Sequence, residues 1–230
     1  MTGLFITFEG TEGGGKSTQI KLLSERLHAL GRKVRLLREP GGTPIGEEIR
    51  HTLKHSEANH AMTSEAELLL MNASRAQLVR EVIRPALRAG EIVLCDRFYD
   101  STTASQGYGR ELDLKFVKDV IDFAVGDTRP DLTLLLQVPV VVSESRRQSR
   151  LAAASQQSSG DVTTRGDAEH SPVPLRDRME EADRSFFERV QHGFQMIASS
   201  EPLRVKAIDA TLGIETVAAA IWTQVSAVLR

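Results

Sequence analysis

The residues whose types and spacing point most directly to chemistry lie near the start of the chain. They match the pattern G-x-x-x-x-G-K-S/T in full and run, with one further hydroxyl residue, as Gly10, Thr11, Glu12, Gly13, Gly14, Gly15, Lys16, Ser17, Thr18. In such a loop the backbone N–H groups converge on a phosphate, the lysine bridges two phosphates and the serine hydroxyl binds Mg²⁺. The pattern predicts a P-loop for a nucleoside triphosphate, and an ordinary glycine-rich turn is the alternative.

The segments on either side of this loop have the patterns that a P-loop requires. Residues 4–8 are aromatic, β-branched and apolar and predict a buried strand that stops at Gly10. Apolar residues then recur at helical spacing from Ile20 to Leu30, and Gly31 stands where a left-handed cap would end a helix. The motif therefore lies between a strand and a helix.

The rest of the chain alternates in the same way. Further strands are expected at 33–37, 91–95, 131–138 and 203–208, and helices at 64–88, 113–125, 178–198 and the end of the chain. This alternation predicts an α/β fold with a five-stranded parallel sheet sandwiched by helices, a P-loop NTPase similar to the nucleoside monophosphate kinases. We expect residues 1–230 to form a single domain with its active site at the carboxyl ends of the strands.

Composition narrows the class of protein. The net charge is −2 and 40% of the residues are hydrophobic, which argues against nucleic-acid binding and against membrane-surface binding. No apolar run approaches the roughly 18 residues of a membrane span. The only cysteine, Cys95, lies in an apolar run and is expected to be a buried, inert thiol in a cytoplasmic protein.

Charged residues at the ends of two predicted strands indicate a second anion site. Asp96 and Arg97 follow the third strand, and Arg38 follows the second strand ahead of a proline and two glycines. Asp96 and Ser17 are the expected Mg²⁺ ligands, and two guanidinium groups at one sheet edge suit a second phosphate. A surface ion pair is the alternative for Asp96 and Arg97.

A phosphate acceptor also explains the absence of a Ser/His/Asp or Cys/His arrangement, because an ionised phosphomonoester needs no strong general base. Lys16 is the only cation in the phosphate loop, so further cations are expected from a lid at about 143–178. This lid includes Arg147, Arg150 and an insertion at 152–174 whose polar composition indicates flexibility. A solvated basic helix face is the alternative for these arginines.

Over nearly its whole length the sequence resembles the thymidylate kinase family. The resemblance is carried by FEGTEGGGKST, REPGGT, SRAQLV, DRFYDSTTASQGYGR, RPDLTLLL, DRMEEADRSFFERVQHGF and IDA. It implies transfer of the γ-phosphoryl group of ATP to dTMP, giving dTDP and ADP for dTTP synthesis, with Mg²⁺ as cofactor and a homodimer as assembly. A P-loop without its own arginine is similar to the bacterial type, in which the lid supplies one, with Arg150 as first choice and Arg147 as second.

The resemblance also implies individual roles. Glu12 would contact the deoxyribose 3′-hydroxyl, Arg38 and Arg97 the acceptor phosphate, and Arg75 the thymine edge. The full expected substrate-binding set is Glu12, Arg38, Glu39, Pro40, Met71, Arg75, Arg97, Ser101, Ser105 and Gln106.

Some positions depart from the family pattern. Met71 stands where a phenylalanine is usual, Ser105 where a tyrosine is usual and Gln137 where an aspartate is common. These departures keep two alternatives open, namely a kinase for another nucleoside monophosphate and a non-catalytic nucleotide-binding protein. Farther along the chain, a helical stripe of Phe186, Phe187, Val190 and Phe194 is expected in the core or at a dimer surface.

Overall fold

The computed structural model describes residues 3–146, 148–149 and 183–229. Arg147, Arg150 and the insertion 152–174 lie outside the described residues, so the predictions made for them stay predictions. Among the described residues, none of the helices combines the length and the apolar character needed to cross a membrane.

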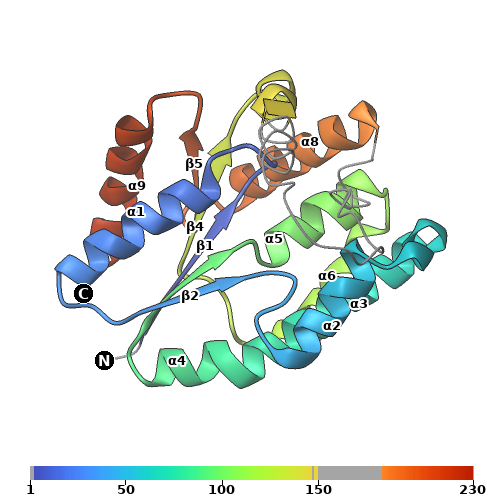
Figure 1. The fold of residues 1–230 in the computed structure, drawn as a ribbon, viewed down its shortest axis with the longest axis horizontal. Helices are drawn as coiled ribbons and strands as arrows, with labels where there is room; N and C mark the ends of the chain where they lie inside the picture. Colours follow the sequence, from blue (N-terminus) through green and yellow to red (C-terminus); the bar gives the residue numbers. More distant parts are fainter. Residues whose placement is uncertain (1–2, 147, 150–182, 230) are drawn as a thin grey trace, which may run out of the picture.

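The core of the molecule is a parallel five-stranded sheet (Figure 1). Its strands are β1 (Leu4–Glu9), β2 (Val34–Arg38), β3 (Ile92–Asp96), β4 (Leu132–Gln137) and β5 (Val205–Asp209). They lie in the order β2-β3-β1-β4-β5, so β1 is central and the chain crosses over it between β3 and β4. The predicted α/β fold with a five-stranded parallel sheet is confirmed, and each predicted strand overlaps an observed one.

Helices cover both faces of the sheet because β1 is apolar on both sides. Ile6 and Phe8 pack in one core cluster with α1 (Lys16–Ala29) and α9 (Ile214–Val228). Phe5 points the other way, into a cluster with α3 (Ser64–Leu78) and α6 (Leu114–Val125). Helix α8 (Arg184–Ser200) packs on Leu135 of β4 and on Ala104. Successive β1 side chains therefore face opposite layers, as a strand requires.

The observed elements differ from the predicted ones in two places. The expected helix 64–88 is α3, a π-helical turn (Val79–Ile83) and the short α4 (Arg84–Arg88). The sequence patterns missed the helical segment after β3, which consists of α5 (Tyr99–Thr102) and a π-helical stretch (Thr103–Gly109). Glycine disfavours helices, yet at Gly109 a Cβ would lie 2.5 Å from the Phe186 ring, so packing against α8 requires glycine there.

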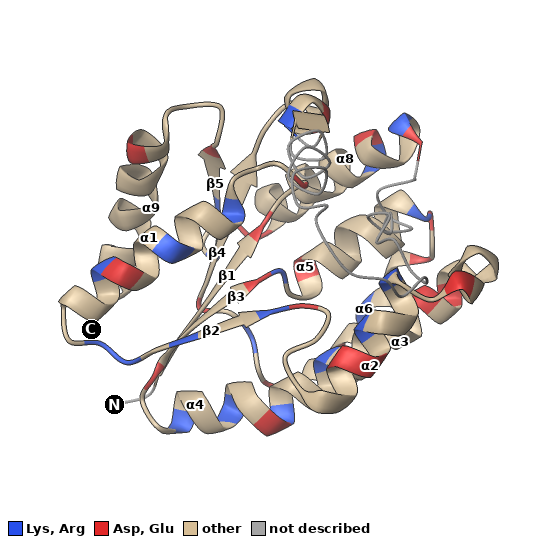
Figure 2. Ribbon diagram, viewed as in Figure 1, with Lys and Arg blue, Asp and Glu red and all other residues tan. Residues whose placement is uncertain are grey.

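The segment after β2 is also helical, in α2 (Pro44–Lys54) and a 3₁₀ turn (Glu57–Ala61). Thr43 begins α2, because its hydroxyl accepts a hydrogen bond from the Gly46 N–H at 3.0 Å and Pro44 occupies the first turn. Figure 2 shows acidic and basic residues interspersed over the molecule, with both signs at the carboxyl ends of the central strands. Both signs of charge therefore occur together at the strand ends, and the chain as a whole is close to neutral, with a net charge of −2.

Candidate active site

The P-loop connects β1 to α1 through backbone conformations that favour glycine. Gly10, Gly13 and Gly15 have φ values of 123°, 75° and 84°. At Gly10 a Cβ would lie only 2.2 Å from the carbonyl oxygen of Leu136. Gly15 precedes α1 without any side-chain cap, which leaves the first N–H groups of the helix directed at the loop. The loop thus has the backbone geometry that cradles a phosphate.

Lys16 is held inside this loop. Its Nζ donates hydrogen bonds of 3.0 Å to the carbonyl oxygens of Gly10 and Thr11, and the side chain is buried. Burial, and next the nearby Arg97 guanidinium, lower the pKa of Lys16 to about 7, against an opposing effect of Asp96. An anion in the loop would favour the charged ammonium.

The P-loop lines a cleft of about 660 Å³. Residues 12–19 form one wall, and the other side carries charged groups that include Arg38, Arg50, Asp96 and Arg146. Arg146 donates from Nη1 to the carbonyl oxygens of Gly13 and Ala210, both at 3.2 Å. We call this cleft the donor cavity.

Asp96 and Ser17 both line the donor cavity, as the metal-site prediction requires. Asp96 Oδ1 is buried and accepts no hydrogen bond from any described residue. A buried carboxylate oxygen without a donor, beside a hydroxyl and a phosphate loop, fits the all-oxygen coordination that Mg²⁺ prefers. The residues present therefore suit Mg²⁺.

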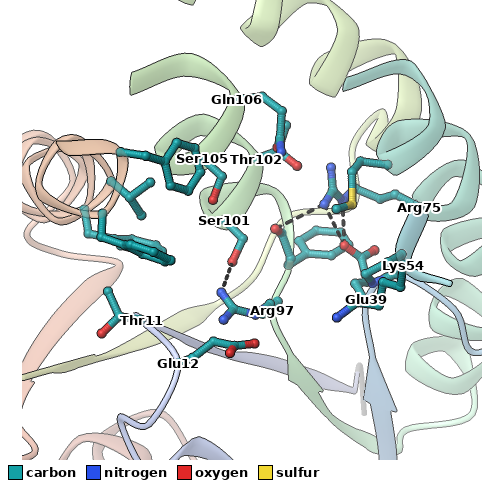
Figure 3. A pocket seen from close by; sticks show the side chains of 17 residues that line it. Thr11, Glu12, Glu39, Lys54, Arg75, Arg97, Ser101, Thr102, Ser105 and Gln106 are labelled. Carbon is teal, nitrogen blue, oxygen red and sulfur yellow. Dashed lines mark hydrogen bonds and ion pairs between the residues drawn. The ribbon is translucent and has the colours of Figure 1, made fainter. Parts of the chain in front are cut away.

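A second cavity, the acceptor cavity, is also lined by Arg97 (Figure 3). It contains nine of the ten expected substrate-binding residues, namely Glu12, Glu39, Pro40, Met71, Arg75, Arg97, Ser101, Ser105 and Gln106. The tenth, Arg38, lines the donor cavity and not this one. Its guanidinium donates to Pro40 O at 3.2 Å and to Glu47 Oε2 at 3.0 Å.

Arg75 is fixed by several hydrogen bonds at one wall of the acceptor cavity. It is 2% exposed and donates to Glu39 Oε2 at 2.8 Å, Asn72 Oδ1 at 2.9 Å and Phe98 O at 3.2 Å. Burial raises the pKa of Glu39, and the charge and hydrogen bond of Arg75 oppose that rise. The pair presents a rigid polar edge to the cavity, as recognition of a planar base requires.

Arg97 occupies a strained position between the two cavities. Its φ is 69°, in the left-handed region that non-glycine residues rarely adopt. Its N–H donates to Phe8 O at 2.9 Å, and Nη1 donates to Ser101 Oγ at 3.1 Å. These bonds hold the guanidinium at the carboxyl edge of the sheet, where the sequence predicts it.

Glu9 supports this turn and was missed by sequence reasoning. It is fully buried at the end of β1, and it accepts hydrogen bonds from the Phe98 N–H at 2.7 Å and from the Ser101 hydroxyl. Burial, and next the charge of Asp100, raise the pKa of Glu9 to about 8. The only sequence signal is a carboxylate at the last position of an otherwise apolar strand.

The opposite wall of the acceptor cavity is apolar. Phe186, Val190 and Phe194 are buried in the core, as predicted, but together with Phe187 they also line the cavity, which was not predicted.

Gln106 is a buried polar residue of the acceptor cavity. It is 1% exposed and donates to Glu67 Oε1 at 2.8 Å. Lys54, Phe98 and Thr102 also line this cavity, and none of them was assigned a role from the sequence.

The two cavities adjoin. Glu12, Glu39, Lys54 and Arg97 line both of them, so the P-loop faces the acceptor cavity across a shared boundary. The arrangement therefore places a triphosphate site beside a pocket with one polar wall and one aromatic wall.

A model of the thymidylate kinase family matches residues 8–221 of the chain. The chain belongs to the thymidylate kinase family. Thymidylate kinases from Syntrophotalea carbinolica and Thermomicrobium roseum are each 44% identical to it over 226 residues, which is 98% of this chain and 96% of each relative. The crystal structure of thymidylate kinase from Ehrlichia chaffeensis superposes with a TM-score of 0.72 at 31% identity, covering 98% of this chain and 99% of that one.

As a thymidylate kinase, the chain is an enzyme that phosphorylates dTMP with ATP as the phosphate donor. The family, the fold and the reaction predicted from the sequence are confirmed. Two adjoining cavities, one built around a phosphate loop and one with a polar and an aromatic wall, fit a reaction between two nucleotides.

Proposed function

We propose that the γ-phosphoryl group of ATP, bound in the donor cavity, passes directly to dTMP in the acceptor cavity at their shared boundary. The observation that carries this proposal is that Arg97 and Glu12 line both cavities. Transfer in line needs the two phosphates to meet without intervening protein. A common boundary with a guanidinium group on it satisfies that need.

On the donor side, the P-loop amides and Lys16 bind the β- and γ-phosphates. Lys16 then exchanges its two carbonyl partners for phosphate oxygens. Ser17 and Asp96 would hold Mg²⁺, which supplies charge neutralisation for the triphosphate.

On the acceptor side, Arg97 binds the dTMP phosphate and Arg75 the thymine edge. Glu12 contacts the 3′-hydroxyl, and Gln106, Ser101, Ser105 and Met71 complete the nucleoside pocket. Phe186 and its neighbours on α8 provide apolar surface for the base. No general base is required, because the dTMP phosphate is already ionised at neutral pH.

Further parts of the proposal lie beyond the two cavities. Arg150, or failing that Arg147, supplies the lid cation, and the chain acts as one domain within a homodimer. Phe116 and Phe123 of α6 are 52% and 84% exposed, which supports an assembly that covers apolar surface. Cys95 is a buried free thiol, which is compatible with the cytoplasm.

The test is an acceptor panel. ADP release is measured with ATP and Mg²⁺ against dTMP, dUMP, CMP and AMP, with Lys16→Met as the control. We expect the highest kcat/KM for dTMP and a loss of about 10³ in kcat in the control. A higher kcat/KM for another monophosphate would reassign the acceptor, and ATP binding without turnover of any monophosphate would favour a non-catalytic protein.

A further inference from the structure

The boundary between the two cavities contains a cation that no motif predicts. Lys54 is the last residue of α2, is half-buried, and lines both cavities. Figure 3 shows it extending into the pocket from the same side as Glu39 and Arg75, across from Thr11. Among the described residues, only Arg97 is another cation that lines both cavities.

Lys54 adds a positive charge to this boundary. Glu39 and Arg75 form a buried ion pair of 2.7 Å, so their charges balance. Of the remaining boundary residues, Glu12 carries one negative charge and Arg97 one positive charge. Lys54 therefore provides the net positive charge of the boundary, and an acceptor phosphate brings nearly two negative charges.

Arg38, the cation that the sequence assigns to this task, is held elsewhere. Its guanidinium is bonded to Glu47 Oε2 and Pro40 O, and it does not line the acceptor cavity. Glu47 and Lys54 are seven residues apart on α2, which places them on one face of the helix. One face of α2 therefore carries Glu47, which binds Arg38, and two turns later Lys54.

We infer that Lys54, together with Arg97, binds the phosphate of the acceptor nucleotide. The inference rests on the proposed function, because it assigns a further residue to the same acceptor site. A lysine suits this position because its ammonium carries a compact charge on a flexible stem.

The test compares ligands that differ only in the phosphate. Affinities for dTMP and for thymidine are measured by calorimetry on the full chain and on Lys54→Met, which keeps the stem and removes the charge. We expect about tenfold weaker dTMP binding with unchanged thymidine binding, since one charge-assisted contact is lost. Lys54→Arg should retain dTMP affinity within about threefold.

Lys118→Met is the matched control. Lys118 is an exposed lysine of α6 that pairs with Asp122 and lines neither cavity, so its replacement should leave both affinities unchanged. Equal weakening of dTMP and thymidine in Lys54→Met would mean general damage to the pocket and would overturn the inference. Unchanged dTMP affinity would overturn it too.

The two proposals fail in different ways. If the unmodified chain does not phosphorylate dTMP, the proposed function fails, whatever Lys54→Met does to dTMP affinity. If the unmodified chain is active and Lys54→Met binds and phosphorylates dTMP normally, only the inference about Lys54 fails.

Discussion

The donor and acceptor cavities meet at one boundary but are built in opposite ways. The donor cavity is an open cleft whose anion site is main chain and glycine from one continuous segment, residues 10–18. The acceptor cavity is narrow, about 80 Å³, and its walls are side chains from distant parts of the chain, many of them bonded to one another. A backbone site is therefore local in sequence, whereas a base-recognition site depends on the packing of the whole fold.

This difference predicts that damage to one cavity should not spread to the other. Lys16→Met gives the largest expected effect, a loss of about 10³ in kcat, because it removes the cation between the β- and γ-phosphates. Binding of dTMP should stay within about twofold, since Lys16 does not line the acceptor cavity. Steady-state kinetics and dTMP calorimetry measure the two quantities, and a large loss of dTMP affinity would mean that the cavities are not separate.

Arg75→Met should lower both the free energy of unfolding and the affinity for dTMP. Removing one partner of a buried pair leaves Glu39 without its guanidinium, which costs about 3 kcal/mol of unfolding free energy. Denaturant unfolding with and without dTMP measures this. Lys115→Met is the surface comparison, because both side chains of the Lys115–Asp119 pair are exposed and the pair should contribute little to stability. Equal losses in the two variants would contradict the rigid acceptor wall.

Arg97→Ala should lower kcat by about 10², with ATP affinity changed little. The reason is that its guanidinium acts on the phosphate transferred between the cavities, while the P-loop binds ATP through main-chain groups. Ser101→Ala, which removes the 3.1 Å support of Arg97 together with the hydrogen bond to Glu9, should cause a smaller loss in the same direction. An equal drop in ATP affinity and in turnover for Arg97→Ala would mean that Arg97 binds ATP in the donor cavity and not the acceptor phosphate.

Glu9→Gln should change the pH dependence of stability. Glu9 has a folded-state pKa of about 8 against an ordinary value of 4.5; burial and then the charge of Asp100 raise this pKa, while the Ser101 hydrogen bond and the charge of Arg97 lower it. Its stabilising contribution is complete below about pH 4.5 and is lost as the pH rises through about 8, by about 1.4 kcal/mol per pH unit at most. Urea unfolding is measured between pH 5 and 9 in steps of about half a pH unit. The free energy of unfolding should decline less steeply with rising pH for Glu9→Gln than for the unmodified chain. Glu81→Gln on the exposed surface is the control, and parallel curves for both variants would remove Glu9 from this account.

How much the sequence predicts follows from the same contrast. The P-loop, the five strands and the position of Arg97 were predictable, because each depends on a short segment and on the rule that parallel strands end at one edge. Most acceptor residues were reached only through the resemblance to a family. Residue spacing alone does not tell which side chains from α3, α5 and α8 will meet.

The misses have physical causes. Gly109 argues against a helix in the sequence, because glycine disfavours helices. The segment is helical nevertheless, and its close packing on Phe186 leaves no room for a side chain at position 109. Arg38 was assigned to the acceptor phosphate from its place at a strand end and from the family resemblance, and this assignment stays a prediction; in the structure its guanidinium donates to Glu47 Oε2 of the following helix at 3.0 Å. Lys54 and Glu9 received no role from the sequence, since a lysine at a helix end and an acid at a strand end are ordinary features. The fold places Lys54 at the boundary of the cavities and Glu9 beneath the turn after β3, where it accepts a hydrogen bond from the Phe98 N–H.

The most direct test of the shared boundary is the affinity of a bisubstrate ligand, adenosine and thymidine joined by five phosphates. If the two cavities adjoin as described, calorimetry should give a Kd at least about 100-fold below those of ATP and dTMP alone, because one molecule fills both sites and the second contact is intramolecular. The adenosine-adenosine analogue should gain far less. A bisubstrate Kd no lower than that of ATP would contradict the account, because it would mean that the two cavities are not connected.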